Sequence, residues 1–220
     1  MQAEPEAVAI GEQAPASDNP TLDDAPVARV RAAARAPKVE PLFAQTLSRR
    51  TNRAPFEPRA VDPRALGAIV GASIEGVDAR FVDAPDALAS IKALAREAWR
   101  IEWDTDRTRR ESIAVTRIGK REINDAPYGL ALSGAPMEAL AAAGVLSREA
   151  MDRPGTTAYA QSLSFYNRAI DSAAAFVAAT TQTNTRADQL AAGAAWLRMH
   201  QAATREGVAF HPLSQALQEF

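Results

Sequence analysis

A long helix with clear signals at both ends constrains the C-terminal third of the chain. Thr185 and Asp188 have the spacing of a capping box, in which each side chain accepts a hydrogen bond from the other residue's backbone N–H at a helix start. Gly207 suits the left-handed conformation that often follows a helix end. The sequence therefore predicts a helix over 186–205.

Strands and further helices are predicted on both sides of this helix in the sequence. Apolar or alternating side chains predict short strands over 27–31, 77–82, 172–181 and 208–210. Apolar side chains at helical spacing predict helices over 40–50, 62–70, 83–103, within 104–121 and from Ser214 onward. Because helices alternate with isolated strands and dominate them, the fold class is α/β or α+β.

Two of these helices carry specific expectations. In the first, Leu42, Phe43 and Leu47 are expected to lie on one face. In the second, Asp62 is expected to cap the N-terminus, with Pro63 at the first helical position, where its missing N–H has no cost.

The chain divides at about residue 26. Residues 1–26 are rich in Ala, Pro, Glu and Asp and show no sustained apolar period, which predicts a disordered arm or the remnant of a longer segment. Residues 27–220 are expected to form one domain, and at this length it can bury a sizeable core.

The composition excludes several classes of function. The chain has 25 Lys+Arg and 27 Asp+Glu, a formal net charge of −2, so no strong field favours nucleic acid or an acidic membrane surface. It has no cysteine and only two histidines, His200 and His211, which excludes disulfides, thiolate metal sites and multi-histidine metal centres. No metal site is expected.

No targeting or membrane segment is expected either. The apolar runs fall short of the roughly 18 residues of a membrane helix. The acidic N-terminus also lacks the basic and apolar regions of a secretory signal. The expected location is the cytoplasm.

The densest positive cluster is Arg49, Arg50 and Arg53, with Thr51 and Asn52 between them. Guanidinium forks and a hydroxyl provide the charge and the bidentate hydrogen bonds that a phosphate monoester requires. The same arginines also suit a solvated helix C-terminus, where positive charge interacts favourably with the helix dipole. Spacing alone leaves both interpretations open.

Other chemistry has weaker support. His211 has no Ser, Asp or Glu at a spacing diagnostic of a catalytic triad, and His200 lies in the long helix, so both are expected to be structural. The chain has neither a GxGxxG nor a GxxxxGK[ST] motif. The turn around Pro212 could offer backbone amides to an anion, or it could simply connect a strand to a helix.

Taken together, three ordered segments resemble the FMN-binding nitroreductase-like family, and in particular its two-repeat Acg-type branch. Residues 48–53 followed by Phe56 resemble the family's RRS/T-x-R-x-F phosphate motif. The helix over 188–207 resembles its central glycine- and alanine-rich helix. Residues 211–215 resemble the strand-to-helix turn that faces the flavin. The likeness covers 27–220.

The resemblance implies an α+β sandwich in which helices flank a central, mostly antiparallel sheet. It implies FMN as cofactor, and the residues that would bind it are Arg49, Arg50, Thr51, Arg53, Pro212, Leu213 and Ser214. The implied reaction is ping-pong electron transfer, in which NAD(P)H reduces the flavin and the flavin reduces a nitroaromatic or quinone acceptor. No catalytic side chain is expected, since the cofactor carries the chemistry.

Two departures from the family leave alternatives open. The family's Asn-x-Gln-Pro-Trp segment has no match, and the chain stops at Phe220, before the family's closing strand. The chain is therefore expected to be the second repeat of a longer protein, truncated at both ends. The alternatives are a non-catalytic flavin-binding or storage protein and an inactive fragment. A homodimer, or pairing with a missing half, is expected because the helix over 186–205 is rich in alanine.

Overall fold

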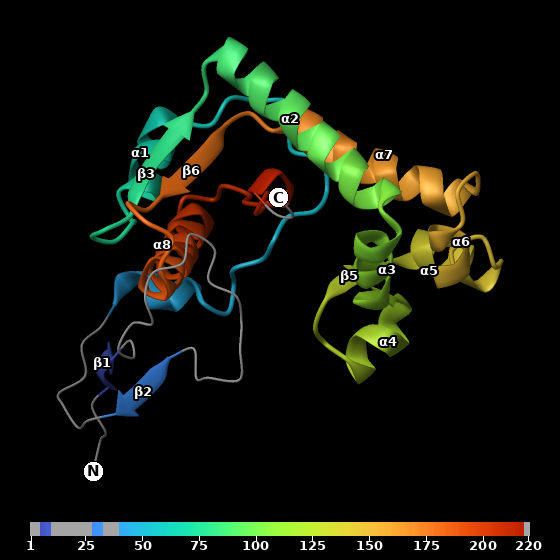
Figure 1. Ribbon diagram of the computed structural model, residues 1–220, viewed down its shortest axis with the longest axis horizontal. Helices are drawn as coiled ribbons and strands as arrows, with labels where there is room; N and C mark the ends of the chain where they lie inside the picture. Colours follow the sequence, from blue (N-terminus) through green and yellow to red (C-terminus); the bar gives the residue numbers. More distant parts are fainter. Residues whose placement is uncertain (1–4, 10–27, 33–39, 218–220) are drawn as a thin grey trace. The chain divides into compact units, whose positions relative to one another are not determined.

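The computed structural model describes residues 5–9, 28–32 and 40–217 (Figure 1). These residues form two compact units. The first unit comprises the described residues of Met1–Asn52, Arg59–Ala84 and Ala174–His211, and the second those of Arg53–Pro58, Pro85–Ala173 and Pro212–Phe220. Each unit is built from segments that lie far apart in the sequence.

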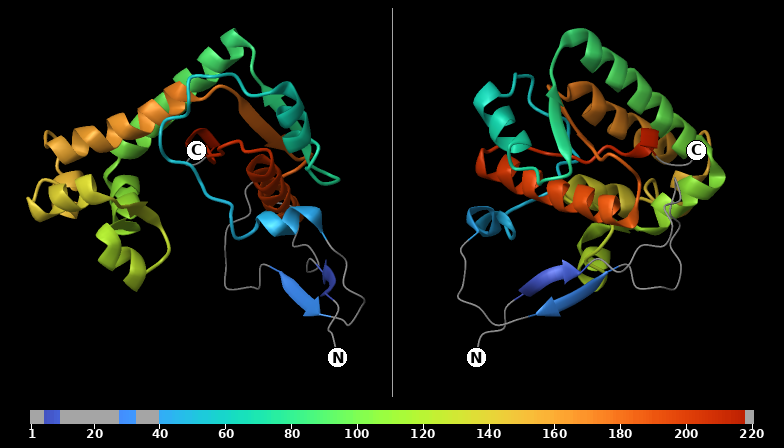
Figure 2. Two further views of the ribbon diagram at one scale, coloured as in Figure 1. Left: turned by 180° about the vertical axis from the view of Figure 1, so that it is seen from behind. Right: turned by 60° about the vertical axis from the view of Figure 1, so that its left-hand side comes forward.

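The first unit combines a long helix with two antiparallel strand pairs. β3 pairs with β6 from Asp78↔Thr180 to Val82↔Phe176, and the two strands lie side by side in each view (Figure 1, Figure 2). The elements of this unit are β1 (Pro5–Ala9), β2 (Arg29–Ala32), η1 (Pro41–Gln45), α1 (Pro63–Val70), β3 (Asp78–Val82), β6 (Phe176–Thr180) and α8 (Arg186–Arg205).

The core of the first unit lies where α8 meets η1 and α1. Its buried side chains are Leu42, Ile69, Met199, Ala202 and Ala203. The predicted end signals of the helices over 62–70 and 186–205 are confirmed. The Asp62 side chain accepts a hydrogen bond from the Arg64 backbone N–H at the start of α1. Thr185 and Asp188 form the capping box of α8, and Gly207 has φ +68°.

The second unit is predominantly helical. α2 and α7 run side by side (Figure 1, Figure 2), and the Trp99 indole N–H donates to the Leu163 carbonyl across them at 3.3 Å. The elements are α2 (Pro85–Asp104), α3 (Asp106–Ala114), β4 (Thr116–Ile118), α4 (Gly119–Asp125), β5 (Leu130–Leu132), α5 (Ala135–Ala142), α6 (Arg148–Asp152), α7 (Thr157–Ser172) and η2 (Gln215–Leu217). β4 and β5 pair in parallel.

An aromatic core stabilises the second unit. Trp99 and Trp103 lie one helical turn apart on α2, with ring centroids 5.2 Å from each other. Tyr166 of α7 stacks against Trp99 at 4.5 Å. Burial raises the pKa of Tyr166 to about 12, and its hydroxyl donates to Gln215 Oε1 at 3.0 Å.

The helix predicted over 40–50 is wrong in length and type. The structure has a short 3₁₀ helix, η1, with Pro41 at its start. Leu42 is buried, but Phe43 and Leu47 are exposed, so the three do not share a buried face. The last turn closes through the Ser48 hydroxyl and the Arg49 N–H, both of which donate to the Gln45 carbonyl. The regular helix ends at Gln45, before the arginines.

Two further predictions need correction. The strand predicted over 208–210 is only a single parallel bridge between Phe210 and Thr51. The helix predicted from Ser214 is a 3₁₀ turn over Gln215–Leu217 as far as the structure describes it. Of the arm predicted over 1–26, the described part is Pro5–Ala9, which forms β1 with β2 as its partner. The rest of that arm lies outside the described residues.

The fold class is α+β with helices dominating, as the sequence predicts. In the described part of the chain, the strands form three two-stranded sheets, of which β4–β5 is parallel. None of the described helices is both long and apolar enough to cross a membrane.

Candidate functional site

Residues 46–52, here called the arginine segment, follow η1 in the chain and run along the C-terminal half of α8. The Gln201 side-chain N–H of α8 donates to the Thr46 hydroxyl at 3.0 Å. Further along, the Asn52 N–H donates to the Phe210 carbonyl at 2.9 Å, next to the Thr51–Phe210 bridge. The two ends of the segment are therefore fixed to parts of the first unit that lie about 150 residues away in sequence.

His200 of α8 holds the middle of this segment. Its side chain is 1% exposed, and its ring lies between Trp196 and Phe210, at 5.1 and 5.2 Å between ring centroids. Nδ1 lies 3.2 Å from Arg49 Nη1, and Nε2 lies 3.1 Å from the Arg50 carbonyl. An arginine can only donate and a carbonyl can only accept, so these partners assign the proton to Nε2.

The pKa of His200 is lowered. Burial is the largest cause, the hydrogen bond to the Arg50 carbonyl opposes it, and the positive charge of Arg49 lowers the pKa further. His200 is therefore neutral at pH 7, and the positive charge here resides on the arginines. Both ring nitrogens are engaged, so this histidine positions the segment and is not a free acid or base.

Arg49 is the residue whose surroundings point to a ligand. Its guanidinium carbon lies 5.7 Å from the centroid of the Trp196 ring. Among the described residues, Arg49 Nε and Trp196 Nε1 are buried and have no hydrogen-bond partner. Buried donors normally find a partner, so two unmatched donors in one cluster indicate a place for an acceptor.

Arg50, next to Arg49 in the sequence, has a side chain that bonds to the backbone of its own turn. Arg50 is exposed, and its Nη1 donates to the Leu47 and Arg49 carbonyls at 2.8 and 2.7 Å. These bonds fold the side chain back over the turn. Within the described part of the chain, no carboxylate forms an ion pair with Arg49 or Arg50, so the segment keeps two positive charges.

The other predicted site residues belong to the second unit. Arg53 and Pro212 are exposed, while Leu213 and Ser214 are half-buried. The Ser214 carbonyl accepts a hydrogen bond from the Leu217 N–H at 2.8 Å, which closes η2. That these residues bind the same ligand as Arg49 stays a prediction.

The sequence predicts Trp196 and His200 as structural residues, and the burial and two hydrogen-bonded nitrogens of His200 agree with this; it does not reveal that both contact the arginine segment. The spacing of Trp196 and His200 in the sequence indicates that their side chains lie on the same face of the helix. Residues four apart share a helix face, and in α8 this places both rings toward the arginine segment. Their partner, Arg49, lies about 150 residues earlier, so no local pattern connects them.

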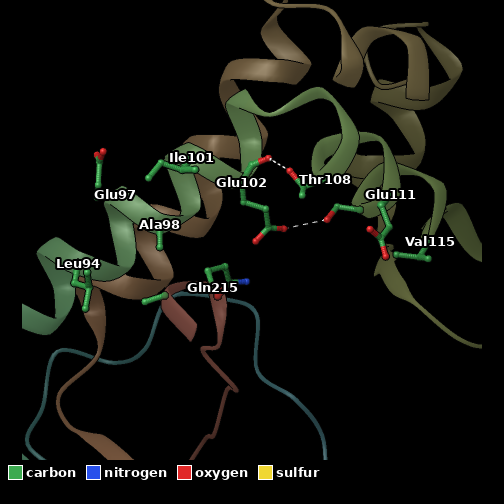
Figure 3. Close-up of a pocket in the computed structure, with 11 residues that line it drawn as sticks. Leu94, Glu97, Ala98, Ile101, Glu102, Thr108, Glu111, Val115 and Gln215 are labelled. Atoms are coloured by element: carbon green, nitrogen blue, oxygen red, sulfur yellow. Dashed lines mark hydrogen bonds between the residues drawn. The ribbon is translucent and has the colours of Figure 1, made fainter. Parts of the chain in front are cut away.

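A separate pocket of about 440 Å³ lies in the second unit, between α2, α3 and η2 (Figure 3). None of the residues predicted to bind a flavin lines it. Among the described residues, no group of three or more His, Cys, Asp or Glu side chains is arranged to hold a metal ion.

Comparison with known proteins gives no family assignment: no family model, no curated protein and no solved structure matches the chain.

Proposed function

We propose that this protein binds FMN through Arg49, Arg50 and Thr51, and that it is an NAD(P)H-dependent oxidoreductase of the nitroreductase type. The observation that carries the proposal is the buried, unmatched Nε of Arg49 in a cluster whose positive charge has no carboxylate partner among the described residues. A phosphate monoester supplies both the negative charge and the acceptor oxygens that this cluster lacks.

The arrangement of the three resembling segments also supports the proposal. The arginine segment, the helix α8 and the chain before the 211–215 turn meet at His200 and Phe210. Two of the segments that resemble the family, the arginine segment and the helix over 188–207, are therefore in contact here. The proposal extends to the fold: β3–β6, with α1 and α8 beside it, would be part of the family's central sheet.

Each residue would have a distinct role in holding the phosphate. Arg49 would donate from Nε, while its Nη1 stays on His200. Arg50 and Thr51 would add charge and a hydroxyl at the surface. His200, neutral and fixed, would keep the arginine in place. When bound, FMN would supply the redox chemistry, taking a hydride from NAD(P)H and passing electrons to a nitroaromatic or quinone.

The test is a titration of the protein with FMN and with riboflavin, followed by flavin fluorescence. Arg49→Gln should weaken FMN binding by about 10- to 100-fold, the value of a charge-assisted hydrogen bond. Riboflavin lacks the phosphate, so its affinity should not change. The matched control is Arg64→Gln, an exposed arginine of α1 in the same unit, which should leave both affinities unchanged.

Arg50→Gln serves as a second variant because Arg50 is exposed and its loss should not disturb the core. It should weaken FMN binding without affecting the circular dichroism spectrum. Equal affinities for FMN and riboflavin in the unmodified protein would contradict a phosphate site at these arginines.

Catalysis is tested separately from binding. If the protein is an oxidoreductase, NADH or NADPH should bleach the absorbance of bound FMN under anaerobic conditions, and a quinone should restore it. Bound FMN that neither cofactor reduces would instead identify the non-catalytic flavin-binding or storage protein.

A further inference from the structure

The pocket of the second unit combines apolar walls with negative charge. Leu94, Ala98 and Ile101 follow one another at i, i+4 and i+7 on α2, so they share a single face of that helix (Figure 3). Leu94 is 61% exposed and Ile101 is 53% exposed. Val115, which follows α3, adds a fourth apolar side chain. Water therefore contacts a continuous apolar strip inside a concave site.

Hydrogen bonds fix the two helical walls of this pocket. The Thr108 hydroxyl of α3 donates to the Glu102 carbonyl of α2 at 2.6 Å. The Ser112 hydroxyl, one turn later on α3, donates to the Glu102 carboxylate at 3.1 Å. Both bonds appear in Figure 3. They connect α2 to α3, so the pocket is built into the unit.

The charge of the lining has one sign. Glu97, Glu102 and Glu111 line the pocket, and no lysine or arginine does. Glu97 forms an ion pair with Arg100 at 2.7 Å, and it points away from the other two carboxylates (Figure 3). Glu111 forms no ion pair among the described residues. Glu111 thus places negative charge beside the apolar strip, while the Glu102 carboxylate is held by Ser112.

We infer that this pocket binds a small organic cation with an apolar body, such as an arylalkylamine. The apolar body would lie against Leu94, Ala98 and Ile101, and the ammonium would lie at Glu111. The volume of about 440 Å³ falls in the range of roughly 300–1,000 Å³ typical of small-molecule sites. The inference does not depend on flavin binding, because Arg49, Arg50 and Thr51 belong to the other unit and none of the residues predicted to bind a flavin lines the pocket.

The experiment compares two probes that differ in charge and share an apolar group. The full-length protein is titrated by calorimetry with 1-naphthylmethylammonium and with 1-naphthylacetate. The ammonium should bind at least about 10-fold more tightly, since only it complements the carboxylates. Equal affinities, or no binding of either probe, would overturn the inference.

Substitutions in the pocket test whether the ammonium probe binds there. Glu111→Gln should weaken binding of the ammonium about 5- to 10-fold, and Ile101→Ser should weaken it by a similar factor through lost apolar contact. Both residues are exposed, so the fold should survive. The control is Glu149→Gln, an exposed glutamate of α6 outside the pocket, which should bind as the unmodified protein does. Unchanged affinity in both pocket variants would place the cation elsewhere and contradict the assignment.

Discussion

At the scale of single residues, burial decides what each charged or titratable side chain does. His200 is nearly inaccessible and shares its two nitrogens between Arg49 and the Arg50 carbonyl. The sequence places it in the long helix but does not show which residues it contacts. Its role follows from a partner segment about 150 residues away, which is why the sequence predicts only a structural histidine.

His200 should make stability depend on pH. Burial lowers its pKa below the ordinary value of 6.5, so below pH 6.5 the unfolded chain binds a proton that the folded chain does not. The free energy of unfolding should therefore fall as the pH decreases, by at most about 1.4 kcal/mol per pH unit. Urea titrations between pH 7.5 and 5.5 measure this slope. His200→Gln should flatten it.

Arg109 and Arg110 are adjacent and share the same carboxylates, yet they should differ in importance. The side chain of Arg109 is 3% exposed and contacts Asp106, Asp152 and the Trp103 carbonyl. Arg110 is 62% exposed and contacts the same two aspartates. The helix predicted within 104–121 is thus not wholly solvated.

Replacing these arginines one at a time tests that difference. Arg109→Leu should lower the free energy of unfolding by about 2–3 kcal/mol, since it removes the donor to the buried Trp103 carbonyl and the buried partner of both aspartates. Arg110→Leu should cost less than about 1 kcal/mol, as exposed ion pairs do. Chemical denaturation of both variants gives the comparison, and equal costs would show that burial does not control this cluster.

At the scale of elements, the sequence predicts best what nearby residues determine. Asp62 with Pro63, and Thr185 with Asp188, are local signals, and both helix starts are confirmed. η1 ends at Gln45, before the end predicted at residue 50. α7 has no counterpart among the predicted helices, although its Thr156 cap and the helical spacing of Tyr159, Leu163 and Tyr166, which pack against the core, are local signals.

The capping box of α8 should contribute measurably to stability, since α8 carries His200. The Thr185 hydroxyl accepts a hydrogen bond from the Asp188 N–H at 3.3 Å, and hydrogen bonds from Thr183 and Thr185 lower the pKa of Asp188. Thr185→Ala should cost about 1 kcal/mol in the free energy of unfolding. Thr185→Ser keeps the hydroxyl and should cost much less. If both variants unfold at the same urea concentration, the cap does not stabilise the helix.

At the scale of the whole molecule, the chain builds two units from interleaved segments. Residues 53–58 belong to the second unit although both flanking segments belong to the first. No linker composition marks these boundaries, so the sequence predicts one domain over 27–220. At the site, the sequence identifies Arg49, Arg50 and Thr51 as candidates, while the meeting of Thr51 with Phe210 depends on long-range folding.

The most direct test of the central claim, that this chain binds FMN, is an absorbance scan of the purified protein from about 300 to 550 nm. The scan is recorded before and after incubation with FMN and removal of free ligand by desalting. We expect a retained flavin band that is lost in Arg49→Gln and kept in Arg64→Gln. A correctly folded protein that retains no flavin after incubation would contradict the account.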